Sequence, residues 1–241
     1  MTVRLCLHGF TGGPRSWDFL ARASSEVLIA PALIGHDGAN EPETVSRFED
    51  EVDRLAAFAN GKPVHLIGYS LGARLALGIA VRHPGLVSRL SLLSGHPGLT
   101  SEPERALRRA SDAAWCDLLQ TQGLAAFVDA WQAQALWASQ ERLPPAIREQ
   151  KRKERLSHSA VGLCRSLRVT GLATMPNFLP LLTQIRVPTD VVAGELDAKF
   201  CELARVLARG LEHGRLAIIP DTGHDLLLEQ PELITQLIRG T

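Results

Sequence analysis

The motif that most constrains the fold of this chain is Gly68-x-Ser70-x-Gly72, which lies where an expected strand gives way to an expected helix. The apolar run at 64–67 predicts a buried strand, and the pattern at 73–82 predicts a helix. A serine between two glycines in this context is typical of a nucleophile elbow, a sharp and strained turn that exposes the serine hydroxyl. Larger side chains two positions before and after Ser70 would collide, so the sequence predicts that both glycines are required.

The rest of the chain supports a sheet built from parallel strands. Short apolar runs alternate with segments of helical periodicity, and this alternation predicts an α/β architecture with a mostly parallel central sheet covered by helices on both faces. A length of 241 residues allows one compact globular domain with a sizeable core. Strands are expected at residues 3–7, 26–31, 64–67, 87–93, 189–193 and 215–219.

One long segment departs from this alternation. Between about residues 102 and 182 the sequence has helical patterns only, and it is rich in Arg, Ala, Leu and Gln. A helical stretch between two α/β portions indicates an insertion that covers the sheet. We therefore expect an α/β core formed by residues 1–96 and 186–241 and a helical cap formed by residues 97–185.

Two further residues are candidates for a catalytic triad with Ser70. In proteins with a nucleophile elbow the chain order is serine, acid, histidine, and Asp197 and His224 follow two of the expected strands in that order. Because open parallel sheets place functional residues beyond the carboxyl ends of their strands, the three side chains are expected to meet. His224 would take the proton of Ser70, and Asp197 would orient the imidazole and stabilise its charged form. Glu195 is a weaker rival to Asp197, and Asp221 is too near His224 in sequence to be an obvious partner.

The loop after the first expected strand, His8-Gly9-Phe10, is a candidate for part of an oxyanion hole. With this kind of elbow, one donor comes from that loop and the other from the residue after the nucleophile, so the backbone N–H groups of Phe10 and Leu71 are the predicted donors. Preorganised donors can each contribute roughly 3 kcal/mol to the stabilisation of an oxyanion. A plain glycine-rich turn would have the same tripeptide, and His8 is more readily interpreted as structural.

Composition argues against several other functions. Lys plus Arg and Asp plus Glu number 26 each, and a formal net charge of zero is unlike that of a nucleic-acid binder. No cluster of His, Cys, Asp or Glu has ligand spacing, and no dinucleotide-binding or P-loop pattern occurs, so neither a metal nor an organic cofactor is expected. No apolar run reaches membrane-spanning length and no secretion signal is evident, which predicts a cytoplasmic protein without membrane contact, expected to be monomeric. The cysteines form no C-x-x-C pair and are interpreted as free thiols at Cys6, Cys116, Cys164 and Cys201.

Several longer motifs narrow the interpretation. They are the segments 7–12, 68–74, 95–99, 104–112, 194–200 and 223–224. Together they resemble those of the 2-succinyl-6-hydroxy-2,4-cyclohexadiene-1-carboxylate synthases of menaquinone biosynthesis, which have the α/β-hydrolase fold, and the resemblance runs from Leu5 to the C-terminus. The elbow and triad are shared by a vast superfamily. Arg74, the stretch 97–99, the arginine-rich segment 104–112 and the loop at 197–200 are far more specific.

The resemblance implies a carbon–oxygen lyase that eliminates pyruvate from 2-succinyl-5-enolpyruvyl-6-hydroxy-3-cyclohexene-1-carboxylate, with Ser70 acting as a base rather than forming an acyl-enzyme. It also implies that arginines grip the carboxylates of this substrate, a task suited to bidentate guanidinium groups. For each arginine of the cap, the alternative is a solvent-exposed helix face. Tyr69 and Trp131 match aromatic positions that line the family's site. The matching arginines are Arg74, Arg105, Arg108 and Arg155.

Two other classes of function, a hydrolase and a non-catalytic binding protein, occur on the same fold. A carboxylesterase, or a hydrolase that cleaves carbon–carbon bonds in a carboxylated small molecule, needs the same three residues. A non-catalytic binding protein on this fold would have no chemical need for Asp197. The cap arginines discriminate among these functions, because an esterase for neutral esters has no use for several buried guanidinium groups.

Overall fold

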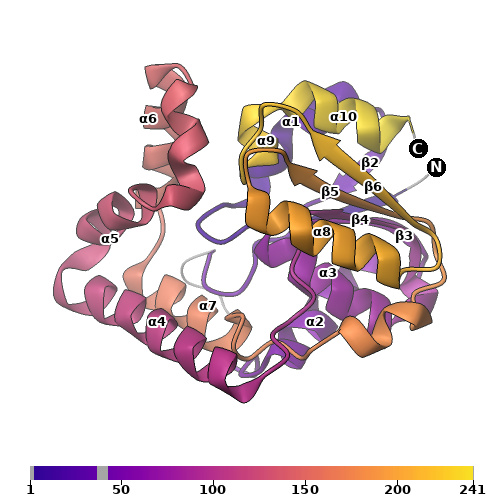
Figure 1. Ribbon diagram of the computed structural model, residues 1–241, viewed down its shortest axis with the longest axis horizontal. Helices are drawn as coiled ribbons and strands as arrows, with labels where there is room; N and C mark the ends of the chain where they lie inside the picture. The colour runs from indigo at the N-terminus through magenta and orange to yellow at the C-terminus, as the bar shows by residue number, and fades with distance from the viewer. Residues whose placement is uncertain (1–2, 37–42, 241) are drawn as a thin grey trace.

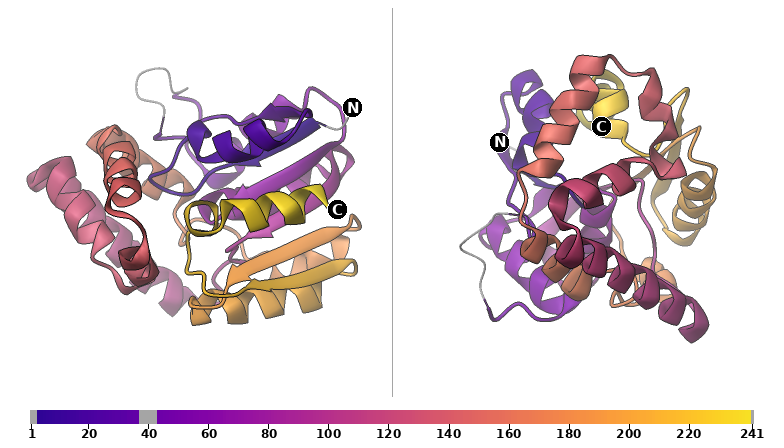
Figure 2. Two further views of the ribbon diagram at one scale, coloured as in Figure 1. Left: turned by 90° about the horizontal axis from the view of Figure 1, so that it is seen from above. Right: turned by 90° about the vertical axis from the view of Figure 1, so that its left-hand side faces the viewer.

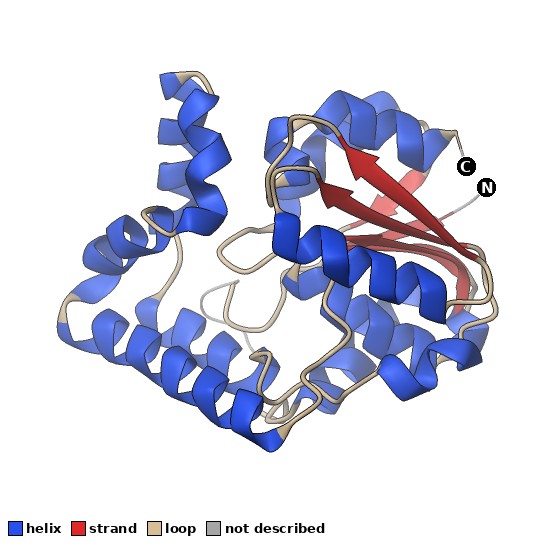
Figure 3. Cartoon of the chain, in the orientation of Figure 1, coloured by secondary structure: helices blue, strands red, loops and turns tan. Residues whose placement is uncertain are grey.

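The computed structural model describes residues 3–36 and 43–240, and these residues form one sheet of six strands. All neighbouring strands are parallel, in the order β2-β1-β3-β4-β5-β6 (Figures 1 and 3). The predicted α/β architecture with a mostly parallel sheet is confirmed. β2 is shorter than the strand expected at 26–31, and it lies at the edge of the sheet, where β1 is its neighbour. The strands are β1 (Val3–Leu7), β2 (Val27–Ile29), β3 (Val64–Tyr69), β4 (Val87–Leu93), β5 (Thr189–Gly194) and β6 (Gly214–Ile219).

Helices cover both faces of this sheet. α2, α3 and α8 supply buried side chains to one face, and α1, α9 and α10 supply them to the other. Figure 2 shows α1 and α10 side by side. No helix in the described part of the chain is long and apolar enough to cross a membrane. The α-helices are α1 (Asp18–Ala23), α2 (Phe48–Ala56), α3 (Leu71–Arg82), α4 (Glu102–Thr121), α5 (Gly123–Gln132), α6 (Pro145–Leu156), α7 (Ala160–Thr170), α8 (Ala198–Gly210), α9 (Leu226–Glu229) and α10 (Pro231–Arg239).

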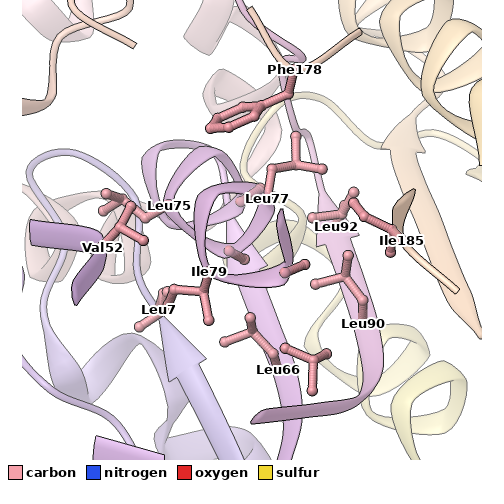
Figure 4. Packing of buried hydrophobic residues seen from close by; sticks show 14 of the residues in the cluster. Leu7, Val52, Leu66, Leu75, Leu77, Ile79, Leu90, Leu92, Phe178 and Ile185 are labelled. Atoms are coloured by element: carbon pink, nitrogen blue, oxygen red, sulfur yellow. The ribbon is translucent and has the colours of Figure 1, made fainter. Parts of the chain in front are cut away.

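Burial on both faces explains why the strands are apolar over most of their length. Along β1, Leu5 and Leu7 belong to the cluster on the α3 side, whereas Cys6 belongs to the cluster on the side of α1 and α10. In Figure 4, Leu77 and Ile79 of α3 lie among buried side chains from β1, β3 and β4. This packing anchors α3 on the central strands, so the N-terminal end of the helix has a fixed position over the sheet.

Helices α4 to α7 lie between β4 and β5 in the sequence and beyond the carboxyl ends of the strands in space (Figures 1 and 2). They have a hydrophobic cluster of their own, in which Phe127, Trp131 and Leu163 are buried and against which Phe10 packs. Gly123 has a φ of +84° and turns the chain between α4 and α5. The division into a core and a cap at residues 97 and 185 remains a prediction.

Candidate active site

Ser70 lies at the junction of β3 and α3 with a positive φ of +52° and a ψ of −107°. Such a conformation costs a residue other than glycine about 1–3 kcal/mol, so the surrounding structure must hold it. The two neighbouring glycines make the turn possible. A Cβ at Gly68 would lie 2.3 Å from the backbone oxygen of Gly72, and a Cβ at Gly72 would lie 2.0 Å from that of Leu7. The prediction that both glycines are required is confirmed.

Gly72→Ala is expected to lower the free energy of unfolding by at least about 3 kcal/mol, which lowers Tm by about 6–12 °C in a chain of this length. The added Cβ would clash with the backbone of β1, a strand held on both sides by β2 and β3. Gly85→Ala is the matched control, because a Cβ at Gly85 would meet no atom within 4 Å. Scanning calorimetry measures both variants, and equal Tm values would contradict the account of the elbow.

The hydrogen-bonded chain predicted for the three triad candidates is present. Ser70 Oγ lies 3.0 Å from His224 Nε2, and His224 Nδ1 lies 2.7 Å from Asp197 Oδ2. His224 is 2% exposed and Asp197 is 8% exposed, so water is largely excluded from the second of these contacts. With Nδ1 donating to the carboxylate, Nε2 can accept the serine proton, which is the arrangement of a general base.

The surroundings of the triad fix its geometry. Asp197 precedes α8, and its Oδ1 accepts a hydrogen bond from the backbone N–H of Phe200 at 3.3 Å. The ring of Phe200 also packs edge-on against the His224 ring at 4.4 Å, and the ring of Trp137 does so at 5.5 Å. Ser94 donates its hydroxyl to the backbone oxygen of His224 at 3.1 Å. The imidazole is therefore held between two aromatic rings and one carboxylate.

The two rival carboxylates have other places in the structure. Glu195 Oε2 accepts a hydrogen bond from the backbone N–H of Asp221 at 3.1 Å, and the side chain of Asp221 is exposed. Among the described residues, Asp197 is the carboxylate that His224 contacts. The choice of Asp197 over both rivals agrees with this geometry.

The loop after β1 is fixed by two neutral histidines. Burial lowers the pKa of His8 to about 3, so its ring is uncharged at neutral pH. Its Nδ1–H donates to the backbone oxygen of Gly9 at 2.8 Å, and its Nε2 accepts from the N–H of Leu33 at 3.1 Å. His36, whose pKa burial also lowers, accepts at Nε2 from the N–H of Thr11 at 3.1 Å. These contacts hold the segment that contains Phe10, and they give His8 the structural role expected of it.

A cavity of about 490 Å³ opens over Ser70. Both expected oxyanion residues, Phe10 and Leu71, line it. So do two of the expected arginines. Arg74 donates to the backbone oxygen of Thr170 at 2.8 Å, and Arg108 Nε donates to the Asp112 carboxylate at 2.8 Å. Tyr69, Trp131 and His224 also line this cavity, which we call the catalytic cavity.

The two arginines give the catalytic cavity a positive charge. Burial and the proximity of Arg108 lower the pKa of Arg74 to about 9, so Arg74 remains cationic at neutral pH. Asp112 is paired with Arg108, and its pKa is raised by burial. Lys199 and Asp197 also line the cavity, so three cations stand against two carboxylates, Asp112 and Asp197, and an anionic ligand would complete the charge balance.

A second cavity, of about 860 Å³, adjoins the catalytic cavity, because Gly9, Phe10, Tyr69 and Trp137 line both. Arg155 lines this second cavity rather than the first. The expectation that Arg155 lies over Ser70 stays a prediction, because Arg155 lines the adjoining cavity rather than the catalytic cavity itself. Its guanidinium lies 5.0 Å from the centre of the Trp137 ring, on which it forms a cation–π contact.

Two buried donors, on residues that line the second cavity, have no hydrogen-bond partner among the described residues. The Nε of Arg155 and the hydroxyl of Tyr69 are buried and make no hydrogen bond with any described residue. Arg155 is 2% exposed and Tyr69 is 5% exposed. Burial raises the pKa of Tyr69, so its hydroxyl stays protonated and can donate. A buried donor without an acceptor costs about 1–3 kcal/mol, and an acceptor atom on a ligand would recover that cost.

The structure corrects the expectation that Arg105 binds substrate. Its guanidinium donates to the backbone oxygens of Leu99, Ala173 and Met175 at 2.7–2.9 Å. Arg105 lines neither the catalytic cavity nor the second cavity. It ties the start of α4 to the segment after α7 and has a structural function.

Two aromatic residues of the site were not among the candidates from the sequence. Trp137 contacts both the His224 ring and the Arg155 guanidinium, and Phe200 contacts the His224 ring. Phe200 lies in the motif around Asp197, so the motif was a usable signal. Trp137 lies in a 3-10 segment, Ala135–Arg142, whose irregular pattern gave no such signal.

The described residues offer no metal site. No group of three or more His, Cys, Asp or Glu in residues 3–36 and 43–240 could hold a metal ion. All four cysteines are buried and free. Burial raises the pKa of Cys116 to about 12, so that this group is a thiol rather than a thiolate ligand at neutral pH.

Comparison with known proteins agrees with this geometry. A family model described as the alpha/beta hydrolase family matches residues 5–237. A Bacillus subtilis (strain 168) protein, provisionally named 2-succinyl-6-hydroxy-2,4-cyclohexadiene-1-carboxylate synthase, is 36% identical over 240 residues, which are 97% of this chain and 88% of the relative. The protein of that name from Enterobacter sp. (strain 638) is 33% identical over 234 residues, 95% of this chain and 86% of the relative. The solved structure of MenH from S. aureus matches with a TM-score of 0.95 at 31% identity, covering 99% of this chain and 92% of that chain.

Proposed function

The chain belongs to the α/β-hydrolase family and, within it, to the 2-succinyl-6-hydroxy-2,4-cyclohexadiene-1-carboxylate synthases, and from this premise we propose that it eliminates pyruvate from 2-succinyl-5-enolpyruvyl-6-hydroxy-3-cyclohexene-1-carboxylate. The observation that carries the proposal is that Arg74 and Arg108 line the same cavity as Ser70. A substrate with several carboxylates fits a serine base flanked by guanidinium groups.

Ser70 is the base in this proposal. His224, oriented by Asp197, increases the basicity of the serine hydroxyl, and Ser70 takes a proton from the substrate ring. As it does so, its own hydroxyl proton passes to His224. The electron pair of that C–H bond moves through the conjugated system, and the C–O bond between the ring and the enolpyruvyl group breaks. The group leaves as its enolate and is protonated to pyruvate, while His224 gives up the proton it had taken. The N–H groups of Phe10 and Leu71 stabilise the negative charge that develops on the conjugated carbonyl oxygen. No carbonyl carbon is attacked, so no water is needed to release an intermediate.

The arginines orient the substrate for this step. Arg74 and Arg108 bind carboxylates in the catalytic cavity, with Trp131 supplying an apolar wall. The Nε of Arg155 and the Tyr69 hydroxyl, which have no hydrogen-bond partner among the described residues, bind a further carboxylate. Holding the substrate so that its ring proton faces Ser70 can lower the activation free energy by several kcal/mol.

The reaction itself tests the proposal. The protein is incubated with the cyclohexene substrate, and released pyruvate is measured; p-nitrophenyl acetate is offered in parallel. We expect pyruvate release and negligible ester hydrolysis. Ester hydrolysis without pyruvate release would instead support a carboxylesterase or a carbon–carbon bond hydrolase, and binding without either reaction would support a binding protein.

Arg155→Ala is expected to raise KM and to lower kcat/KM for the carboxylated substrate by about 30-fold, which corresponds to about 2 kcal/mol for a hydrogen bond to a charged group. Arg148→Ala is the matched control, because Arg148 is exposed on the same helix, α6, and lines neither cavity. Steady-state kinetics measure both variants. An unchanged kcat/KM for Arg155→Ala would remove Arg155 from the substrate site.

We also propose an oligomeric state, a cellular compartment and a class of partner for this enzyme. The enzyme acts as a monomer in the cytoplasm on a free small-molecule polycarboxylate, without nucleic acid or membrane partners. The four buried free cysteines support a reducing compartment, where disulfides are rare. The balanced numbers of basic and acidic residues, 26 each, support the absence of a nucleic-acid partner.

A further inference from the structure

The loop that contains His224 is closed by a side chain from the end of the following helix. Glu229 is the last residue of α9, and its Oε2 accepts a hydrogen bond from the backbone N–H of Gly223 at 2.8 Å. Gly223 immediately precedes His224 and is buried. A buried N–H without an acceptor is costly, so this contact determines how the peptide before His224 is oriented.

The other carboxylate oxygen of Glu229, Oε1, contacts the 3-10 segment Ala135–Arg142, which lies between α5 and α6. Ser139 donates its hydroxyl to Glu229 Oε1 at 2.9 Å, across 90 residues of sequence. Ser139 lies in the 3-10 segment that also contains Trp137, whose ring packs against His224. A Cβ at Gly223 would lie 1.9 Å from the Ser139 hydroxyl, so the two segments approach each other closely at this point.

The other side of His224 has separate anchors. Its backbone oxygen accepts from the Ser94 hydroxyl at 3.1 Å and from the N–H of Leu226 at 3.1 Å. These contacts fix the residue on its C-terminal side, and Glu229 fixes it on its N-terminal side through Gly223. Both imidazole hydrogen bonds of the triad depend on the backbone position that these contacts set.

We propose that Glu229 is a positioning residue for His224. Glu229 holds the loop that contains His224 through Gly223, and through Ser139 it joins this loop to the 3-10 segment Ala135–Arg142. The expected change in kcat rests on the proposed function. The hydrogen bonds that carry the positioning role are present in the protein without substrate. The contact of Ser139 with Glu229 then affects the position of His224, so the 3-10 segment Ala135–Arg142 also helps to position this histidine.

Glu229→Ala is expected to lower kcat by about 10- to 100-fold, because a misplacement of His224 by less than about 1 Å weakens the base, while KM changes by less than about threefold. Glu229→Gln should restore kcat to within about threefold of the parent protein. Its amide oxygen can accept from Gly223 while its NH2 group donates to the Ser139 hydroxyl. Glu232→Gln is the control for the charge alone, because Glu232 is exposed on the adjacent helix, α10.

Ser139→Ala separates the two contacts of Glu229. It leaves the acceptor of Gly223 in place, so we expect a smaller decrease in kcat, of about threefold. In the Glu229→Ala background the same change should have no further effect, because the carboxylate through which it acts is gone. Independent, additive effects would overturn the coupling. Should Glu229→Ala not fold, Ser139→Ala still tests the proposal, and an unchanged kcat in this variant would overturn it.

NMR of the protein labelled with ¹⁵N-histidine gives a readout that needs no substrate. A His224→Gln variant identifies the His224 imidazole signals. We expect Glu229→Ala and Ser139→Ala to shift or broaden these signals, and Glu232→Gln to leave them unchanged. Unchanged His224 signals, with only Tm lowered, would show that Glu229 merely stabilises the fold. If no pyruvate is released by the parent protein, the proposed function fails, whereas the NMR result still decides the positioning role.

Discussion

Ser70→Ala is expected to lower kcat for pyruvate release by at least about 1,000-fold, since the group that takes the ring proton is removed. Substrate binding should persist. The arginines of both cavities are untouched by the change, and the Ser70 hydroxyl donates or accepts no hydrogen bond among the described residues other than that with His224. Isothermal titration calorimetry measures the binding, and a Kd within about threefold of the parent value is expected.

The same serine decides between a base and a nucleophile. If Ser70 acts as a base, mass spectrometry of a rapidly quenched reaction of the parent protein should show unmodified chain. A covalent adduct that accumulates on Ser70 would refute the base mechanism and favour the hydrolase alternative, because an acyl-enzyme forms only by attack on a carbonyl carbon. Near-parental activity of Ser70→Ala would instead exclude Ser70 from the chemistry altogether.

The triad could be predicted because each of its members is tied to the end of a strand. Ser70, Asp197 and His224 follow β3, β5 and β6, and parallel strands bring their carboxyl ends to one edge of the sheet. The elbow could be predicted because its steric requirement is local. Two glycines and a serine within five residues, between a strand pattern and a helix pattern, predict a turn whose backbone contacts exclude a Cβ at either glycine.

Which arginines line the catalytic cavity could not be predicted from the sequence in the same way. Arg105 and Arg108 lie three residues apart on α4, so they share a helix face and no periodicity separates them. The packing of α4 decides: Arg105 meets the backbone oxygens after α7, and Arg108 reaches the catalytic cavity. Arg155 is at the end of α6, and its place in a second cavity follows from the position of that helix relative to Trp137.

Contacts between distant segments set the limit of the sequence analysis. The pairing of Ser139 with Glu229 joins residues from a 3-10 segment and a four-residue helix, neither of which has a usable pattern. The aromatic contact of Trp137 with His224 has the same origin. Such contacts are fixed by how the inserted helices dock over the strand ends, which depends on the packing of a whole hydrophobic cluster rather than on any local motif.

Asp197→Asn is expected to lower kcat by about 10,000-fold, because it leaves the fold intact and reverses the tautomer of His224. Asp197 uses Oδ1 to accept from the Phe200 N–H and Oδ2 to accept from His224 Nδ1. Asparagine is an equally good residue at a helix N-cap, so its amide oxygen takes the position toward Phe200 and its NH2 group faces the imidazole. Nδ1 must then accept, the ring proton moves to Nε2, and the nitrogen that faces Ser70 becomes a donor that cannot take the serine proton.

The Tm and kcat of Asp197→Asn together distinguish a catalytic function of Asp197 from a purely structural one. The Asp197→Asn protein should have a Tm within about 3 °C of the parent, since its cap is retained, a change of less than about 1 kcal/mol. Glu195→Gln is the matched control: Glu195 lies two residues away and contacts the backbone of Asp221 rather than His224, so kcat should change by less than about threefold. If Asp197→Asn kept a tenth of the activity, or if Glu195→Gln lost as much, the carboxylate that orients His224 would have to be sought elsewhere. With both outcomes as expected, the low activity of Asp197→Asn is attributable to one proton on the wrong nitrogen.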